Sequence, residues 1–322
     1  MRILVTGGTG FIGHEVVRRL TDLGMRPRVL VRRISRAPLL SGLDVEAVHG
    51  DLMSAPSLER AVADVDVVVH LAGRATFEPV ERLRPTIVDG TARLAEAAAA
   101  AGVRHIVFGS SLFVHDGAGT VADDTAPHPV LGYGVAKTEA EQVLRRVSEA
   151  GGPTVSVVRL PHVYGPQSVL FGLVRRRLVL FPGRGDNRFA QLHVDDAARV
   201  LVAAALREWS GTAPVADLQS PTWNEFFEVL TTYAPRVRVV HVPAPAAIAA
   251  TAVAGRLLGR TGPTLVGADT IRGWNLELPV ASRRIWDELA LEPVHPTVLS
   301  GIPATLDGSV AFRWRHPVFD WS

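Results

Sequence analysis

The spacing of apolar positions over the first 160 residues predicts short strands that alternate with helices. Residues 66–71 form an almost unbroken apolar run, which is typical of a strand buried on both faces of a sheet. Ile12, Val16, Val17 and Leu20 recur at helical spacing, so one face of that segment is apolar. Strands that alternate with helices indicate an α/β fold whose parallel strands are joined by right-handed crossovers. The expected strands are residues 2–6, 28–31, 45–48, 66–71, 105–108 and 155–160, and the expected helices are residues 11–23, 85–101 and 133–150.

After residue 161 the pattern is less regular. Helices are expected at residues 169–178, 194–206 and 222–233, and strands at residues 189–193 and 237–242. We expect a doubly wound parallel sheet of the Rossmann type together with a smaller, mainly helical substrate-binding domain in the C-terminal part. The Rossmann domain would take residues 1–165 and be re-entered by residues 188–217 and 236–243, and the substrate-binding domain would take residues 166–187, 218–235 and 244–322.

A glycine-rich segment lies between the first expected strand and the first expected helix. It runs from Thr6 to Gly13 as T-G-G-T-G-F-I-G and fits both G-x-G-x-x-G and G-x-x-G-x-x-G. Glycine allows a tight turn, a close approach of the backbone to a pyrophosphate and close packing of helix on strand. The phosphates would meet free N–H groups at the positive end of the helix dipole. The sequence therefore predicts a dinucleotide-binding loop made of Gly7, Gly10, Phe11, Ile12 and Gly13.

Two arginines, Arg32 and Arg33, follow the second expected strand. An acid at this place would hold the ribose 2′-hydroxyl of NAD, but no Asp or Glu is present there. A guanidinium can hold the 2′-phosphate of NADP with two hydrogen bonds. We therefore expect NADP as the cofactor, with NAD as the alternative.

Tyr133 and Lys137 form a Y-x-x-x-K pair, whose spacing puts both side chains on one face of an expected helix. A nearby ammonium favours the phenolate and lowers the pKa of a tyrosine. Such a tyrosine can give or take the proton that accompanies hydride transfer, and Ser111, just past the fifth strand, can hydrogen-bond the substrate oxygen. Lys137 is the only lysine in the chain, although Lys and Arg together number 34. A lysine retained in so arginine-rich a chain indicates a site that needs an amine.

Composition and charge narrow the classes of function. The chain has no cysteine, which excludes disulfides and thiolate metal sites, and its net charge of +2 is too small to favour nucleic acid as a partner. No stretch reaches the about 18 uncharged apolar residues of a membrane span, and the first residues do not resemble a signal peptide. We expect a cytoplasmic homodimer that acts on a small molecule, with no metal, membrane or nucleic-acid partner.

These motifs together resemble the extended short-chain dehydrogenase/reductases, also called the NAD-dependent epimerase/dehydratase family. The resemblance covers nearly the whole chain. It rests on short segments that follow the expected strands or open the expected helices, namely residues 6–13, 50–52, 70–73, 89–91, 110–111, 133–137, 159–161, 163–166 and 193–196.

The resemblance implies that Ser111, Tyr133 and Lys137 are the catalytic residues and that Lys137 also holds the nicotinamide ribose. It further implies a cofactor cleft formed by residues that follow the strands: Asp51 and Leu52 near the adenine, Leu71, Ala72 and Gly73 along the cleft, and Pro161 and His162 beside the nicotinamide amide.

The chain also departs from the family pattern. Ile87 stands where the family often has Asn, so whatever that Asn orders must be ordered otherwise. His115 stands where the family often has Tyr. It could contact the substrate, but we expect it to be solvated, as most loop histidines are. Asp195 and Asp196 are expected to be acids at a helix N-terminus rather than catalysts.

Three functions fit this sequence. The first is a reductase or dehydrogenase of an apolar or cyclic ketone or alcohol, which the apolar stretch 244–258 and the two arginines after the second strand favour. The second is a nucleotide-sugar epimerase that retains NAD; Leu112 and Phe113 replace the acid pair of a 4,6-dehydratase and argue against dehydration. The third is a non-catalytic NADP-binding regulator, although such relatives usually lose the Tyr and Lys. Specificity would lie in the second domain and in loops at residues 74–80, 112–129 and 167–175.

Overall fold

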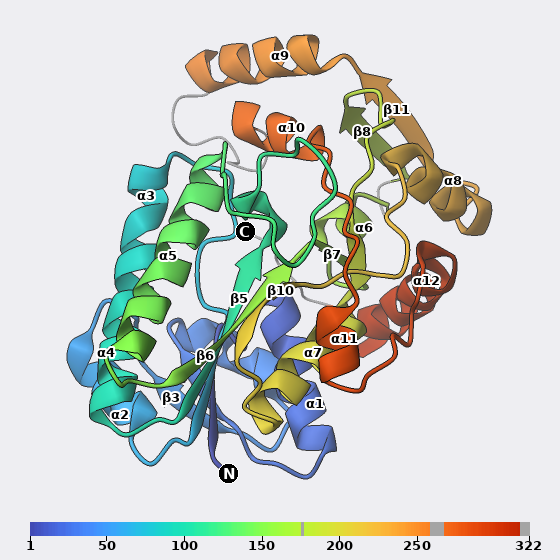
Figure 1. Ribbon diagram of the computed structural model, residues 1–322. Helices are drawn as coiled ribbons and strands as arrows, with labels where there is room; N and C mark the ends of the chain where they lie inside the picture. Colours follow the sequence, from blue (N-terminus) through green and yellow to red (C-terminus); the bar gives the residue numbers. More distant parts are fainter. Residues whose placement is uncertain (175–176, 258–266, 316–322) are drawn as a thin grey trace.

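A computed structural model describes residues 1–174, 177–257 and 267–315. Its centre is a seven-stranded parallel sheet in the order β3-β2-β1-β4-β5-β6-β10 (Figure 1). All of its strands are parallel, and the order in which they are added reverses between β1 and β4, which is the arrangement of a doubly wound Rossmann sheet. The expected fold class is therefore confirmed. The strands are β1 (Ile3–Thr6), β2 (Arg28–Val31), β3 (Glu46–His49), β4 (Val67–His70), β5 (His105–Ser111), β6 (Thr154–Leu160) and β10 (Gly211–Pro214).

Helices cover both faces of the sheet because successive side chains of each strand point to opposite faces. Ile3 and Val5 of β1 belong to one apolar cluster, whereas Leu4 belongs to the other. The first cluster includes α1 (Phe11–Asp22), α7 (Val194–Leu206) and α11 (Arg284–Glu288). The second includes α2 (Ala55–Val62), α3 (Val80–Arg84), α4 (Gly90–Ala100) and α5 (Gly132–Glu149).

Helix α4 differs from the expected helix at residues 85–101 in its first turn. Residues Pro85–Asp89 form a π-helical turn, and regular α-helix begins at Gly90. Gly102 follows the helix with φ of +76°, as expected of a glycine that ends a helix in the left-handed conformation. The short helices α2 and α3 were not expected from the sequence.

A smaller, mainly helical part lies above the carboxyl ends of the strands, with α9, α10 and α8 across the top of the view (Figure 1). It has its own apolar cluster, centred on Tyr164, Phe181 and Trp223. Two short parallel pairs of strands belong to this region: β7 (His162–Tyr164) with β9 (Gln191–His193), and β8 (Leu178–Pro182) with β11 (Arg238–Val242). The helices are α6 (Val169–Val174), α8 (Trp223–Tyr233), α9 (Ala244–Leu257), α10 (Ala268–Trp274) and α12 (Val298–Arg315).

The pairing of β11 with β8 corrects two expectations. Residues 236–243 do not return to the main sheet, because their strand pairs with β8 instead. Residues 177 and 178 do not continue the expected helix at 169–178: the helix ends at Val174, residues 175–176 lie outside the described structure, and β8 begins at Leu178. In β8 Leu178 and Leu180 are exposed while Val179 and Phe181 are buried, which is the two-residue period of a strand.

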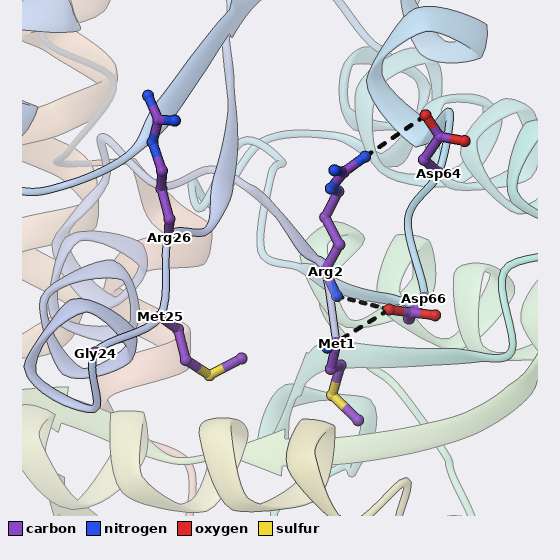
Figure 2. Close-up of a pocket in the computed structure, with 7 residues that line it drawn as sticks. All are labelled: Met1, Arg2, Gly24, Met25, Arg26, Asp64 and Asp66. Atoms are coloured by element: carbon purple, nitrogen blue, oxygen red, sulfur yellow. Dashed lines mark hydrogen bonds and ion pairs between the residues drawn. The ribbon is translucent and has the colours of Figure 1, made fainter.

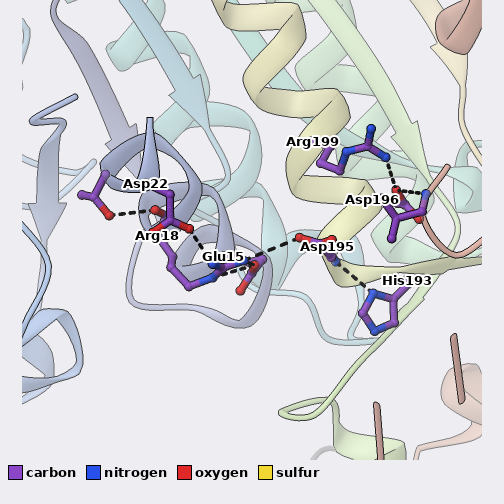
Figure 3. A network of polar contacts seen from close by, with 9 residues as sticks. Glu15, Arg18, Asp22, His193, Asp195, Asp196 and Arg199 are labelled. Carbon is purple, nitrogen blue, oxygen red and sulfur yellow. Dashed lines mark hydrogen bonds and ion pairs between the residues drawn. The ribbon is translucent and has the colours of Figure 1, made fainter. Parts of the chain in front are cut away.

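Polar contacts join α1 to α7 and α7 to the C-terminal segment (Figure 3). Arg18 of α1 lies 3.6 Å from Asp195, at the start of α7. Asp196 is fully buried; its carboxylate accepts hydrogen bonds from the backbone N–H of Val294 at 2.9 Å and of His295 at 2.7 Å. Both aspartates lie in the first turn of α7, as expected. Their negative charges complement the dipole of α7. Asp195 connects α7 to α1, and Asp196 connects α7 to the segment at residues 294–295.

Buried histidines make the stability of this fold dependent on pH. Burial lowers the pKa of His70 and His193 to about 3, and the pKa of His105 and His162 to about 4. Because the unfolded chain takes up protons near pH 6.5 and the folded chain does not, the stability that these histidines contribute is present above that pH and is lost as the pH falls towards 4. Each can contribute at most about 1.4 kcal/mol per pH unit.

We therefore expect the free energy of unfolding in urea to fall between pH 7.5 and pH 5. Asp195 and Asp217 act in the opposite direction, because burial raises the pKa of their carboxyl groups, but burial also lowers the pKa of a fifth histidine, His115. Replacing the exposed His49 with Gln is the control and should leave the slope unchanged. A free energy of unfolding that stays constant over this pH range contradicts the prediction.

Candidate functional site

A hollow at the amino ends of the strands is not the candidate site (Figure 2). It is lined by residues that precede β1, β2 and β4, among them Arg2, Arg26 and Asp66. Asp66 accepts a hydrogen bond from the backbone N–H of Arg2 at 2.6 Å, so its charge is already engaged. Ligands of open parallel sheets bind beyond the carboxyl ends of the strands, at the opposite edge.

All the residues that the sequence predicts for cofactor and catalysis follow the carboxyl ends of strands or lie on helices that begin there. After β1 come Gly7, Gly10, Phe11, Ile12 and Gly13, and after β2 come Arg32 and Arg33. After β3 come Asp51 and Leu52, and after β4 come Leu71, Ala72 and Gly73. Ser111 ends β5, Tyr133 and Lys137 lie in the first turns of α5, and Pro161 and His162 follow β6.

The glycine loop brings β1 against the end of β4. Gly7 has φ of +76°, and a Cβ atom there would lie 2.7 Å from the backbone nitrogen of Ala72. A Cβ at Gly13 would overlap the carbonyl oxygen of Gly7. The backbone N–H of Gly10 donates to that same carbonyl at 2.9 Å. These two glycines are therefore required by the turn itself.

Gly10 is different, because it is exposed and faces open space. A Cβ there would have one neighbour within 4 Å, the Gly7 oxygen at 3.2 Å, and the backbone at Gly10 is extended. Gly10 is also the N-cap of α1, and its place is not filled by a side chain that caps the helix. The first N–H groups of a helix without such a cap can bind an anion, so the loop fits a pyrophosphate.

A buried polar chain holds the glycine loop to the neighbouring elements. The Thr6 hydroxyl lies 2.7 Å from Nδ1 of His70, and Nε2 of His70 lies 3.0 Å from the Thr91 hydroxyl. The backbone N–H of Ala72 donates to the Thr6 hydroxyl at 3.2 Å. Burial and the nearby Lys137 lower the pKa of His70 to about 3, so the ring is neutral and can both donate and accept. Thr6, His70 and Thr91 each lie in a segment that carries the family resemblance, but the sequence alone does not show that their side chains are connected.

Arg32 and Arg33 are both exposed beyond β2. Within the described residues, neither guanidinium forms an ion pair with an acid. Asp51 is half-buried, and its carboxylate accepts a hydrogen bond from the backbone N–H of Met53 at 3.0 Å. The two arginines are therefore free to meet an anion at the edge of the cleft.

Tyr133, Lys137 and Ser111 come together where α5 crosses the end of β5. The Lys137 Nζ atom is buried and donates to the carbonyl oxygen of Gly109 at 2.7 Å. It lies 4.5 Å from the ring centre of Phe108 and 5.9 Å from that of Tyr133. The Ser111 hydroxyl accepts a hydrogen bond from the backbone N–H of Phe113 at 3.3 Å. A lysine, a tyrosine and a serine thus share one corner at the carboxyl end of β5.

The protonation of this corner differs from the expectation for Tyr133. Burial raises the pKa of Tyr133 above its usual value of 10, so the expected lowering of the pKa by Lys137 is wrong for this structure. Burial lowers the pKa of Lys137 to about 8, and the negative charge of Glu141 acts against that lowering. At neutral pH Tyr133 therefore keeps its proton and Lys137 is mostly charged.

Aromatic side chains line the space beside Tyr133. The rings of Phe77 and Phe113 meet edge to face at 4.9 Å between centres, and they lie 6.1 and 6.3 Å from the ring of Tyr133. From Phe113 the series continues through Phe189 and Trp223 to Trp274, whose ring stacks on that of Trp223 at 4.9 Å. The loops at residues 74–80 and 112–129, expected to determine specificity, supply Phe77 and Phe113. Residues 175–176, which include the end of the third such loop, lie outside the described residues.

His162 joins this aromatic surface. Its Nδ1 atom lies 2.6 Å from the Gln191 side-chain oxygen, and its ring centre lies 5.1 Å from that of Trp223. The structure thus places His162 between the end of β6 and the smaller helical part, partly buried against Trp223.

Two departures from the family pattern have structural explanations. Ile87 is buried in the apolar cluster beneath α4, and its Cγ1 atom would lie 3.5 Å from a Cβ at Gly73, so packing replaces the polar contacts of an Asn. The expectation that His115 is solvated is wrong: it is 3% exposed, and its Nδ1 atom lies 3.3 Å from the carbonyl oxygen of Ala126. Burial lowers the pKa of His115, with the Arg159 charge acting in the same direction.

Neither a metal centre nor a membrane span is seen in the described ranges. Among these residues, no three His, Asp or Glu side chains gather in a way that could hold a metal ion. None of the helices described has the length and apolar character needed to cross a bilayer.

Comparison with known proteins gives consistent results. Residues 3–214 match the model of the NAD dependent epimerase/dehydratase family. The chain is 33% identical over 259 residues to a ceramide reductase of Caulobacter vibrioides (strain NA1000 / CB15N), which covers 78% of this chain and 76% of that protein. It is 32% identical over 326 residues to a 3-diazoavenalumate denitrifying reductase of a Streptomyces species, which covers 94% and 99% of the two chains.

The structure is also similar to that of MoeE5, solved in complex with UDP-glucuronic acid and NAD. The TM-score is 0.79 over 97% of this chain and 99% of that chain, and the sequence identity of 24% limits this likeness to the fold. The family match, in contrast, spans more than half of the chain and includes the glycine loop, the buried lysine and the sheet that carries them. The chain therefore belongs to the NAD-dependent epimerase/dehydratase family.

Proposed function

We propose that this protein is an NADP-dependent reductase or dehydrogenase that interconverts a carbonyl and an alcohol on an apolar or cyclic substrate. The observation that carries the proposal is the buried Lys137 ammonium, held against the Gly109 carbonyl and next to Tyr133. Burying a charge is costly unless it is paired and hydrogen-bonded, so a buried ammonium beside a phenol supports a functional role for both. The two relatives named as reductases support the direction of the reaction.

Three side chains of the corner would take part in the proton transfer. A bound nicotinamide dinucleotide would supply or accept the hydride. Tyr133, protonated at neutral pH, would donate its proton to the substrate oxygen during reduction. The charge of Lys137 would stabilise the phenolate that is left, and the Ser111 hydroxyl would hydrogen-bond the substrate oxygen. The same side chains, run in reverse, serve oxidation.

The aromatic surface beside Tyr133 favours an apolar substrate. Phe77, Phe113 and Trp274 are partly exposed and are backed by the buried Phe189 and Trp223. Such rings bury apolar area and orient flat or aliphatic groups. We propose that residues of the smaller helical part and the two loops that carry Phe77 and Phe113 select the substrate.

The alternative is an epimerase of a nucleotide sugar that retains NAD. The likeness to MoeE5, which was solved with UDP-glucuronic acid and NAD, favours this alternative at the level of the fold. A non-catalytic NADP-binding regulator has less support, because Tyr133 and Lys137 are both present and adjacent. The cofactor found in the purified protein separates the first two: exchangeable NADP supports the reductase, and tightly retained NAD supports the epimerase.

The first prediction of this proposal concerns the glycine loop. Gly10→Val should abolish dinucleotide binding and leave the fold intact, because the new side chain points into open space that a pyrophosphate would fill. Gly13→Val is the contrasting variant and should also lower the melting temperature, since its Cβ would overlap the Gly7 backbone. Calorimetric titration with NADP and with NAD, together with thermal unfolding, measures both effects. A normal titration by Gly10→Val would show that the cofactor does not lie on this loop.

The second prediction concerns the choice of cofactor. Replacing Arg32 and Arg33 with Ala should weaken NADP binding about 10- to 100-fold, which corresponds to the loss of charge-assisted hydrogen bonds, and should change NAD binding little. Arg26→Ala is the control, because Arg26 lies at the amino end of the sheet and pairs with Asp44. Equal losses for NADP and NAD would remove the two arginines from the cofactor site.

The third prediction concerns Tyr133. Tyr133→Phe should lower turnover by about 10²–10⁴-fold, because the proton donor is lost, while cofactor affinity stays near that of the wild type. Tyr233→Phe is the matched control, since Tyr233 is exposed on α8. Lys137→Arg and Lys137→Met should weaken both turnover and cofactor binding, and each should combine non-additively with Tyr133→Phe. Wild-type turnover by Tyr133→Phe, measured with a surrogate ketone, would reject the proposed mechanism in favour of the non-catalytic alternative.

A further inference from the structure

The last three residues of β5 are each held by a different contact. The Gly109 carbonyl accepts from Lys137 at 2.7 Å, the Ser110 hydroxyl donates to the Glu141 carboxylate, and the Ser111 hydroxyl accepts from the Phe113 backbone. Lys137 and Glu141 are four residues apart on α5, so they lie on the same face of that helix, one turn from each other. Helix α5 therefore forms hydrogen bonds with two successive residues at the end of β5, Gly109 and Ser110.

Glu141 also contacts β6, the strand next to β5 in the sheet. Its carboxylate accepts from Nη2 of Arg159 at 2.9 Å and from Nε at 3.3 Å. Arg159 lies on β6 directly opposite Ser110 in the sheet register. Both members of the pair are largely covered, with side-chain exposures of 10% for Glu141 and 6% for Arg159. One carboxylate thus binds two neighbouring strands at the level of the catalytic corner.

We propose that Glu141 is a positioning residue that fixes the carboxyl end of β5 through Ser110 and keeps the Lys137 ammonium charged. The inference rests on the proposed function, because the charge of Lys137 matters to Tyr133 in that reaction. Glu141 does not itself reach the space beside Tyr133, since its two oxygens are taken by Ser110 and Arg159. It acts through Lys137 and through the backbone that carries Ser111.

The groups around Lys137 agree with this role. From its own helix it faces Tyr133, which is protonated, and Glu141, which is negative. From β4 it faces His70, whose ring burial keeps neutral, and from β5 it meets the Gly109 carbonyl and the Phe108 ring. Burial lowers the pKa of Lys137, and Glu141 opposes this lowering. If the Glu141 charge is removed, the pKa of Lys137 falls further and more of the amine is neutral at working pH.

The chain offers a direct measurement, because Lys137 is its only lysine. Protein made with ¹³Cε-labelled lysine, and purified without a lysine-containing tag, gives one lysine resonance whose pH titration reports Lys137 alone. We expect Glu141→Gln to move this titration to lower pH by about one unit. The alkaline limb of the pH profile of turnover should move in the same direction. Glu139→Gln is the matched control: it removes the same charge from the same helix, but Glu139 pairs with Arg84 at the surface.

Two further variants complete the test. Ser110→Ala keeps the Glu141 charge, so the Lys137 titration should stay in place while turnover falls about 10- to 100-fold through misplacement of Ser111. If Glu141→Gln leaves Arg159 unpaired and does not fold, Glu141→Gln with Arg159→Met removes both buried charges. It should still shift the Lys137 titration downward, but by less, because loss of the Arg159 cation acts in the opposite direction.

A wild-type titration of Lys137 in a folded variant without the Glu141 charge would overturn the inference, as would wild-type turnover by Ser110→Ala. The lysine titration needs neither substrate nor turnover. Its failure is therefore distinct from failure of the proposed function, which the Tyr133→Phe variant tests.

Discussion

The rest of the site depends on the close approach of helix α5 to the carboxyl end of β5. The hydrogen bond from Lys137 to the Gly109 carbonyl spans 2.7 Å in a buried environment, so the helix cannot move away without leaving an ammonium unpaired. Gly134 makes this approach possible, because a Cβ there would overlap the carbonyl oxygen of Phe113. With the helix seated this deeply, Tyr133 is brought beside Phe113, and Ser111 follows from the strand on the other side. The corner proposed to be catalytic is thus a consequence of how two elements pack.

A second close approach along the same edge of the sheet forms the loop that we propose for the cofactor. Gly7, with its positive φ, lies against the end of β4, and the buried chain from Thr6 through His70 to Thr91 ties β1, β4 and α4 together. His70 is neutral, because burial and the charge of Lys137 lower its pKa to about 3. The His70 ring thus lies between the glycine loop and α4, and the charge of Lys137 acts on it. The N-terminus of α1 and the corner around Tyr133 both lie at the carboxyl edge of the sheet, as a reaction between a bound cofactor and a substrate would require.

The main sheet and the order of its elements could be predicted because central parallel strands are apolar on both faces, as in β4, and because the glycine loop has a fixed relation to strand and helix. The β8–β11 pair could not be predicted, since every residue from Leu178 to Phe181 is apolar and the sequence does not show which of them are buried.

The protonation of Tyr133 could not be predicted either: spacing shows that Lys137 is near, but it does not show how much water is excluded. Burial of His115 depends on Arg159, which is distant in sequence and reaches the same loop through the sheet. The spacing of Glu141 from Lys137 shows that the two side chains share a face of α5. Its partners Ser110 and Arg159 could not be predicted, because they become neighbours only in the folded sheet.

The retention of one lysine in an arginine-rich chain follows from this geometry. A guanidinium carries five N–H donors in a planar fork and stays charged at any working pH. The pocket around Lys137 supplies the Gly109 carbonyl and the faces of Phe108 and Tyr133, which suit a compact ammonium and would leave most donors of an arginine unpaired. An amine can also change its charge near pH 8, where burial places the pKa of Lys137, so its electrostatic effect on Tyr133 can be adjusted by the surrounding residues. The buried Arg159 shows the contrast, because its fork is met by the Glu141 carboxylate and a backbone oxygen of Thr125. Where the fold needs a permanent charge with many partners it uses arginine, and where it needs a small, adjustable charge beside a phenol it uses lysine.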